Sequence, residues 1–439
     1  MLRWLLRFVI IGLLGAFFYH LAFIKAPDNI LSSPGGEALA ANMPGQGGSR
    51  QPEVRVLVAE ALDNAILAIN GKVRVEGVTM SMKTQSGVFS QSVAVDVLPT
   101  GRGIKLGADH FVRVRLKNLD SQPLRLTWGT GSNEKTVSIP HEIEIYGTHV
   151  VENNQKKPKV RILARLPMEE YLYGVVAGEV PTSWPLETLR AQAVASRTFA
   201  YFEVRSRAKE EYDVKASTQS QVWRPSLVVE PRVRRAVDST VGIVLTEKNA
   251  LIKTYFHSEC GGYTADARWV FTSTPLLALS GVRCPRCSDP RNKPSQWSVT
   301  YTRQEIQKRL RSGGEDLLKQ AGEIRMLQGL DAEGRVLRHP TIGRVVTVEI
   351  TMAGGRGATV RIPANKFRHA MGTDKKNIAS TYMTIDGGSE QRVTFSGLGW
   401  GHGVGLCQYG ASYAADKLGY KFLDILALYY PGAKPLRLW

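Results

Sequence analysis

The sequence has few cysteines and no internal repeat. Only 4 of its 439 residues are cysteine, which is too few for the disulfide scaffolds that hold small secreted proteins together. No low-complexity tract is apparent beyond one Pro, Gly and Ser-rich stretch near the N-terminus. Hydrophobic residues make up 43% of the chain, so a globular protein of one elaborated domain, or of two or three domains, is expected.

Two common kinds of catalytic or binding motif are also missing. No Ser-His-Asp arrangement and no HExxH helix can be recognised, so protease chemistry has no obvious carrier. The glycine-rich run GHGVG fits neither GxxxxGK nor GxGxxG, and it lies late in the chain, beyond any βαβ pattern. We therefore reject a nucleotide-phosphate loop.

Acidic residues are outnumbered, 39 against 57 basic ones, which gives a formal charge of +18. Residues 1–40 carry three basic and two acidic side chains, so the excess belongs to the folded part. Such a charge predicts an anionic partner. Nucleic acid, an acidic membrane surface and an anionic cell-wall polymer all satisfy this condition, and charge alone does not choose among them.

The N-terminus narrows this choice. Arg3 and Arg7 precede an apolar run at 8–24, which predicts an export signal or a short membrane anchor in residues 1–25. The triplet at 38–40 resembles a cleavage site but lies farther from the run than usual, which favours an uncleaved anchor. Because basic residues lead the segment, we expect the rest of the chain to be extracytoplasmic, and this argues against a nucleic-acid partner.

The remaining sequence divides into three parts. Residues 26–52 read as a flexible linker. Residues 53–150 alternate apolar and polar side chains in short runs, which predicts a β-rich module of antiparallel strands. Residues 151–439 mix strands with helices near 168–176, 184–202, 231, 303–320 and 422–430. The expected class is α+β: a mixed, β-rich fold with a few helices around a central groove.

One carboxylate has an unusual setting. Glu179 stands in a Gly-Glu-Val-Pro turn, where Gly178 and Pro181 end the first helix. Its neighbours in the sequence are mostly apolar, and such surroundings raise a carboxyl pKa toward proton donation. By contrast, Glu169 and Glu170 fit ordinary solvated surface positions.

The helix that follows Glu179 has a distinctive face. Ser183 is a plausible N-cap, and Pro185 then falls in the first turn. Small and apolar side chains recur along one narrow stripe, at Leu189, Ala193, Ser196 and Ala200. A helix with this stripe is able to pack close to a neighbour.

Two pairs of nitrogen and sulfur ligands suggest a metal site. His257 and Cys260 lie in HSECGGYT, and Cys284 and Cys287 form CPRC. This set matches a tetrahedral zinc site filled entirely by protein ligands, so the role of the ion would be structural. A disulfide between Cys284 and Cys287, or free thiols, are the alternatives. Cys407 is interpreted as a small buried residue only.

Two further segments suit a binding groove. Six glycines fall within residues 397–411, around His402 and Gln408, and their density predicts close backbone approach. STQSQVW at 217–223, which contains Gln221, sets amides and hydroxyls beside an aromatic ring, as sugar binding requires. A polar loop with one buried Trp is the equal alternative for that segment.

Taken together and in order, EEYLYGVVAGEVP, LRAQAVASRTFAYF, STQSQVW, TYFHSECGGYT and GWGHGVGLCQYGA resemble the family of stage II sporulation protein D and the amidase enhancers, which are bacterial cell-wall proteins. The resemblance covers roughly residues 160–435. It implies a lytic transglycosylase that cuts peptidoglycan glycan strands after an amidase has removed the stem peptides. Glu179 would be its catalytic acid.

The resemblance leaves other roles open. Arg197, Gln221, His402 and Gln408 are candidates for holding the sugar, although Arg197 could equally be a structural ion-pair partner. The family's Met-Ser-Gln is replaced here by Leu-Cys-Gln, which keeps Gln408. Because the enhancers are described as stimulators of an amidase, a non-catalytic activator that binds the wall is the alternative function. Zinc is associated with part of the family, but the ligand set remains an inference from this sequence.

Overall fold

The computed structural model describes most of the chain from residue 51 onward. Described are residues 51–439 except 70, 80–83, 90–92, 101–102, 107, 121–122, 130, 153–154, 226–228, 272–273, 313–316, 319–321, 338–341, 354–357, 374–375 and 388–390. The expected anchor at 1–25 and nearly all of the expected linker lie outside these residues. Within them, no helix combines the length and the apolar character needed to cross a membrane.

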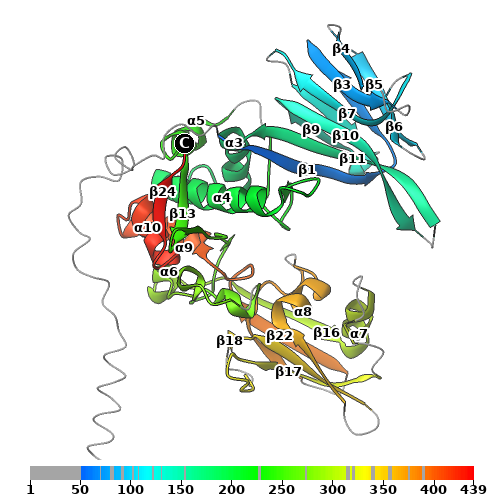
Figure 1. Cartoon of the computed structure of the whole chain (residues 1–439). Helices are drawn as coiled ribbons and strands as arrows, with labels where there is room; N and C mark the ends of the chain where they lie inside the picture. The colour runs from blue at the N-terminus through cyan, green and yellow to red at the C-terminus, as the bar shows by residue number, and fades with distance from the viewer. Residues whose placement is uncertain are drawn as a thin grey trace, which may run out of the picture. The chain divides into compact units, whose positions relative to one another are not determined.

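A 12-stranded sheet fills the N-terminal part of the described chain (Figure 1). Its strands are β1 (Glu53–Leu62), β2 (Ala65–Ile69), β3 (Val73–Thr79), β4 (Thr84–Phe89), β5 (Val93–Thr100), β6 (Gly103–Leu106), β7 (Asp109–Asn118), β8 (Leu124–Trp128), β9 (Lys135–Ile139), β10 (Glu142–Glu152), β11 (Gln155–Pro167) and β12 (Val214–Lys215). The expected β-rich region is present, but β10 crosses residue 150 and β11 pairs with β1, so the sheet extends beyond that boundary.

Three helices adjoin this sheet: α3 (Met168–Glu179), α4 (Leu186–Ser206) and α5 (Pro231–Asp238). Val54 and Val56 of β1 share one buried core with Tyr171 and Val175 of α3. The α3 helix runs three residues farther than expected and ends at Glu179, and Pro185 rather than Ser183 is the N-cap of α4. Each difference affects only a terminal turn.

The predicted stripe on α4 is confirmed. Leu189, Ala193, Ser196 and Ala200 are all fully buried. Small side chains allow neighbouring backbones to approach, and α4 packs against α3, α5, α9 (Gln408–Lys417), α10 (Phe422–Tyr429) and β13 (Ile243–Glu247). The α4 helix therefore lies at the centre of the packed elements next to the groove.

A buried ion pair joins α3 to α4. It corrects the expectation for Glu169 and decides between the two roles left open for Arg197. Arg197 is fully buried, and its Nη2 donates to Glu169 Oε2 at 2.6 Å. Glu169, expected at the surface, is only 7% exposed and also accepts from Gly242 N and Trp439 Nε1 at 3.2 and 3.0 Å. Arg197 is therefore a structural ion-pair partner, and its place in the core is not that of a sugar ligand.

A second core occupies residues 297–395. Its elements are β16 (Gln296–Thr302), α7 (Arg303–Ser312), β17 (Ile324–Leu330), β18 (Gly343–Arg344), β19 (Thr347–Met352), β20 (Thr359–Pro363), α8 (Ala364–Met371), β21 (Tyr382–Asp386) and β22 (Arg392–Leu398). The strands form two sheets, β16-β22-β21-β18 and β17-β19-β20. The expected helix at 303–320 is shorter, because α7 ends at Ser312.

The remaining strands and α-helices lie between α5 and β16 or after β22. They are β14 (Ala250–Leu251), β15 (Phe256–His257), α6 (Pro285–Ser288), β23 (Leu406–Cys407) and β24 (Lys434–Arg437), with short 3-10 turns at Gly131–Asn133, Ala267–Trp269 and Leu277–Leu279. The expected C-terminal helix is α10, and β24 follows it and pairs with β13. The fold is a mixed α+β architecture, as predicted.

The buried ion pair yields a stability prediction. Arg197→Met should lower the free energy of unfolding by about 3–5 kcal/mol, because it leaves the Glu169 carboxylate buried without its partner. Arg361→Met is the matched control, since Arg361 pairs with Glu349 at 2.7 Å but is 69% exposed; it should cost under about 1 kcal/mol. Urea unfolding of both variants measures the difference, and equal losses would contradict the structural role given to Arg197.

Candidate functional site

A groove of about 620 Å³ brings together several segments singled out in the sequence. Its walls come from the end of α3, the loop 217–223, β15, the glycine-rich segment 397–411 and α8. Glu179 is the one carboxylate among the described residues that line it. The predicted central groove therefore exists around the predicted acid.

Glu179 is held by two hydrogen bonds. Its Oε1 accepts from Val222 N at 2.6 Å, and its Oε2 accepts from Gln408 Nε2 at a longer 3.4 Å. A Cβ on Gly178 would lie 2.5 Å from Val222 O, so only glycine lets the loop 217–223 approach α3 this closely. The first bond fixes the carboxyl, while the long second one is readily exchanged.

Burial changes the acidity of Glu179. Removal from water raises its pKa from 4.5 to about 7, and the bonds from Val222 and Gln408 and the charge of Arg224 only partly oppose this. No cation forms an ion pair with it among the described residues. A large fraction of Glu179 is thus protonated near neutral pH, as a general acid requires.

The candidate sugar ligands divide into two groups. His402 and Gln408 line the groove, as expected. Gln221 does not: it is fully buried, accepts from Tyr171 Oη at 2.9 Å and donates to Ser196 O at 3.2 Å. Its side chain holds the loop to α3 and α4. The loop residues that line the groove are instead Thr218, Gln219, Ser220 and Val222.

The glycine-rich segment lies against the HSEC segment. The two strands β15 and β23 pair in parallel, with His257 opposite Cys407, and Glu259 and Trp400 form a further bridge. Gly405 has φ +71°, and a Cβ there would lie 2.0 Å from Tyr255 O. We expected these glycines to let another part of the backbone come close. In the structure that backbone belongs to residues 255–262.

The cysteines form one buried cluster beside the groove. The ligand atoms of Cys260, Cys284 and Cys287 lie within 4.8 Å of one another, and so do those of His257, Cys260 and Cys407. None of the four cysteines, all of which the structure describes, forms a disulfide. The predicted ligands therefore come together, and the expectation for Cys407 is wrong: it is a fifth member of the cluster.

His257 has the features of a metal ligand. Its Nδ1 lies 3.1 Å from Val404 O, so Nδ1 carries the proton and donates to that carbonyl. The other nitrogen, Nε2, is buried and has no hydrogen-bond partner. Burial lowers the pKa of His257 to about 3, which keeps the ring neutral. An unprotonated, unpartnered nitrogen beside thiols fits a metal such as zinc.

Comparisons with known proteins agree with this arrangement. A family model described as "Stage II sporulation protein" matches residues 156–246. Stage II sporulation protein D of Bacillus subtilis is 30% identical over 285 residues, which are 61% of this chain and 74% of that protein. The chain belongs to the stage II sporulation protein D family.

Other relatives of this family member extend the comparison. An amidase enhancer of Bacillus subtilis is 29% identical over 291 residues, 60% of this chain and 39% of that protein. An uncharacterised protein of Brachyspira hyodysenteriae is 29% identical over 278 residues, covering 62% and 67%. A model of a domain of unknown function (DUF8618) matches residues 287–405, the region of the second core.

The sequence did not predict that the second core of this family member contributes to the groove. Arg368, His369 and Thr373, at and after α8, line the same cavity as Glu179. No motif in the sequence around Arg368 marks these residues as part of a groove.

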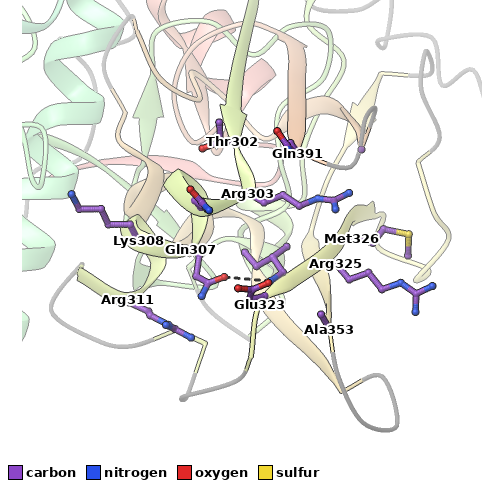
Figure 2. Close-up of a pocket in the computed structure, with 13 residues that line it drawn as sticks. Thr302, Arg303, Gln307, Lys308, Arg311, Glu323, Arg325, Met326, Ala353 and Gln391 are labelled. Atoms are coloured by element: carbon purple, nitrogen blue, oxygen red, sulfur yellow. Dashed lines mark hydrogen bonds between the residues drawn. The ribbon is translucent and has the colours of Figure 1, made fainter.

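A larger pocket of about 970 Å³ lies elsewhere in the second core, next to α7 and β17 (Figure 2). It is lined by Arg303, Lys308, Arg311 and Arg325, with Glu323 as the one carboxylate among its described lining residues. Figure 2 shows Arg303 and Arg325 extending to one side and Lys308 to the other. Because these charges do not converge, the catalytic candidate remains the groove around Glu179.

The metal content of the cluster can be measured. We expect about one transition-metal ion per chain in purified protein by mass spectrometry, and its loss in Cys260→Ala, because Cys260 belongs to both groups of ligands. Ser258→Ala, between two ligand positions, should retain the ion. The alternative is the Cys284–Cys287 disulfide. It would be supported if the protein contained no metal and if two of its cysteines reacted with a thiol reagent only after reduction.

Because the pKa of Glu179 is raised in the folded state, replacing this acid should increase stability by an amount that depends on pH. Below about pH 4.5 the carboxyl is protonated in both the folded and the unfolded protein, so it does not lower the free energy of unfolding. The destabilisation grows as the pH rises and reaches its full size above the folded-state pKa of about 7. Glu179→Gln should therefore raise the Tm relative to the parent by an amount that grows from pH 4.5 to 7.5. Calorimetry at several pH values tests this, and a constant difference would show that the carboxyl is not desolvated.

Proposed function

We propose that this protein is a peptidoglycan lytic transglycosylase that cleaves peptide-free glycan strands between N-acetylmuramic acid and N-acetylglucosamine. The observation that carries the proposal is one carboxyl with a pKa near neutrality in a groove whose described lining has no second carboxylate. Ordinary glycosidases use two carboxylates about 5–10 Å apart. A transglycosylase needs one, because the nucleophile belongs to the substrate.

In the proposed reaction Glu179 acts twice. The protonated carboxyl gives its proton to the glycosidic oxygen as the bond from that oxygen to C1 of the muramic acid breaks, and the N-acetylglucosamine leaves with a free 4-hydroxyl. The carboxylate then takes the proton of the muramic acid 6-hydroxyl, whose oxygen bonds to C1. The product carries a 1,6-anhydro ring, and Glu179 regains its proton.

The other groove residues suit a sugar chain. Thr218, Gln219 and Gln408 offer hydroxyl and amide groups for sugar hydroxyls and N-acetyl groups. Tyr255 and Phe271 stack with ring centroids 4.3 Å apart, and such faces pack on the apolar side of a sugar ring. His402 meets Phe271 edge-on at 4.9 Å, which fixes it in the wall of the groove.

We also propose a structural zinc ion held by four of the five members of the cluster, which are His257, Cys260, Cys284, Cys287 and Cys407. Bound there, the ion would cross-link these segments, and it would perform no step of the cleavage because protein ligands fill its coordination. The substrate lies outside the cytoplasmic membrane, so the proposal places the protein there, held by residues 1–25. An amidase that exposes peptide-free glycan is the expected partner.

The alternative is a non-catalytic activator of an N-acetylmuramoyl-L-alanine amidase. The similarity to a protein named amidase enhancer favours it as a second candidate. In that case the groove and the basic surface would bind the wall and recruit the amidase, with Glu179 serving only as a hydrogen-bond acceptor.

Digestion of purified, peptide-free glycan separates the two functions. We expect the parent protein to release 1,6-anhydro-muramic ends, and Glu179→Gln to reduce the rate at least ~100-fold by removing the acid, with glycan binding retained. Mass spectrometry of the products and sedimentation with insoluble glycan measure the two quantities. Unchanged product release by Glu179→Gln would refute its role, and faster peptide release only with an added amidase would favour the activator.

A further inference from the structure

One cation in the groove has no charged partner. Arg368 of α8 lines the cavity and is only 5% exposed. Its Nε donates to Ile378 O and Ala379 O, both at 3.1 Å, and its Nη1 reaches Asn365 Oδ1 at 3.5 Å. These acceptors are all neutral, and no acidic side chain pairs with Arg368 in the part of the chain that the structure describes.

Two other cations, the fully buried Arg197 and the half-buried Lys253, do have acidic partners. Arg197 forms its pair with Glu169, and Lys253, which also lines the groove, lies 2.5 Å from Glu203. Burial of an unpaired charge is costly, so buried cations are normally paired. Burial and the nearby Arg344 lower the pKa of Arg368 only to about 10, so the charge persists at neutral pH.

One end of the Arg368 guanidinium is available to a ligand. Nη2 makes no hydrogen bond to any described residue, and it is not among the fully buried polar atoms that lack a partner. Since Arg368 lines the cavity, this end is open to the groove that contains Glu179. A guanidinium presented in this way is suited to a carboxylate.

The proposed substrate supplies such a carboxylate. Each muramic acid carries a lactyl group, whose acid is free in peptide-free glycan and is an uncharged amide where a stem peptide is attached. We infer that Arg368 binds the lactyl carboxylate of a muramic acid in the groove and so selects glycan from which the peptides have been removed. The inference rests on the proposed function, and it gives Arg368 a role in specificity rather than in the cleavage.

The bonds to Ile378 and Ala379 also give Arg368 a structural use, so a matched control is needed. Arg309 provides one: its Nη1 donates to Met371 O, at the end of α8, and to Asn377 Oδ1, in the segment that follows. Arg309 does not line the groove. Arg309→Gln therefore removes an arginine that holds the same segment. Arg368→Lys keeps the charge and serves as the conservative variant.

The experiment measures binding rather than turnover. Each substitution is placed in full-length protein that carries Glu179→Gln, and titration calorimetry compares two soluble peptide-free glycans, one with free lactyl acids and one with those acids converted to methylamides. We expect the Glu179→Gln protein to prefer the acid form by at least ~10-fold, as a charge-assisted hydrogen bond would. Adding Arg368→Gln should reduce the preference below ~2-fold, and adding Arg309→Gln should leave it intact.

The outcomes distinguish the two proposals. Equal affinity for both glycans, or a preference that survives Arg368→Gln, would overturn the role of Arg368 while cleavage by the parent protein still supported the transglycosylase. Failure of the parent protein to cleave the acid form would overturn the proposed function instead. If Arg368→Gln does not fold by circular dichroism, Arg368→Lys decides: a reduced preference for the acid form with a native fold supports the inference, and an unchanged preference refutes it.

Discussion

The parallel pairing of β15 with β23 is the contact on which the site depends. It sets Phe256 opposite Leu406 and His257 opposite Cys407, and therefore joins two segments about 150 residues apart. Next to this pairing, His402 and Gln408 line the groove that holds Glu179, and Cys407 within it lies among the thiols. Gly399 and Gly405 are needed because side chains there would overlap the backbone of residues 255–261.

Two glutamates ten residues apart show how context assigns different uses to the same side chain. Glu169 receives the Arg197 guanidinium, Gly242 N and Trp439 Nε1, so it joins α3, α4, β13 and the C-terminus. Glu179 receives one short bond and one long one and no cation. A saturated carboxylate is a structural element, whereas an unsaturated, desolvated one is suited to exchanging a proton.

Local patterns predicted what local physics determines. The alternation at 53–150, the stripe on α4 and the apolar surroundings of Glu179 are all visible within a few residues, and each led to a confirmed element or a fitting environment. The sequence left two roles open for Arg197 and misplaced Gln221 because their partners are distant: Glu169 and Tyr171 lie 28 and 50 residues away. The sequence around a polar residue does not show whether its side chain faces a ligand or the core. Only the packed structure distinguishes these two positions.

The cysteine cluster also explains how the second core contributes to the groove. Cys260, Cys284 and Cys287 precede the core at 297–395, and Cys407 follows it, so the cluster joins the chain where it enters and where it leaves this region. The Glu259 carboxylate reinforces the same point by pairing with Arg286 and accepting from Ser295 N. Closing a loop of this length costs conformational entropy, although the cost grows only slowly with loop length. A metal ion bound by the cluster, as proposed above, would cross-link the two ends of this loop next to the groove and so help to fix the position of α8, and with it Arg368.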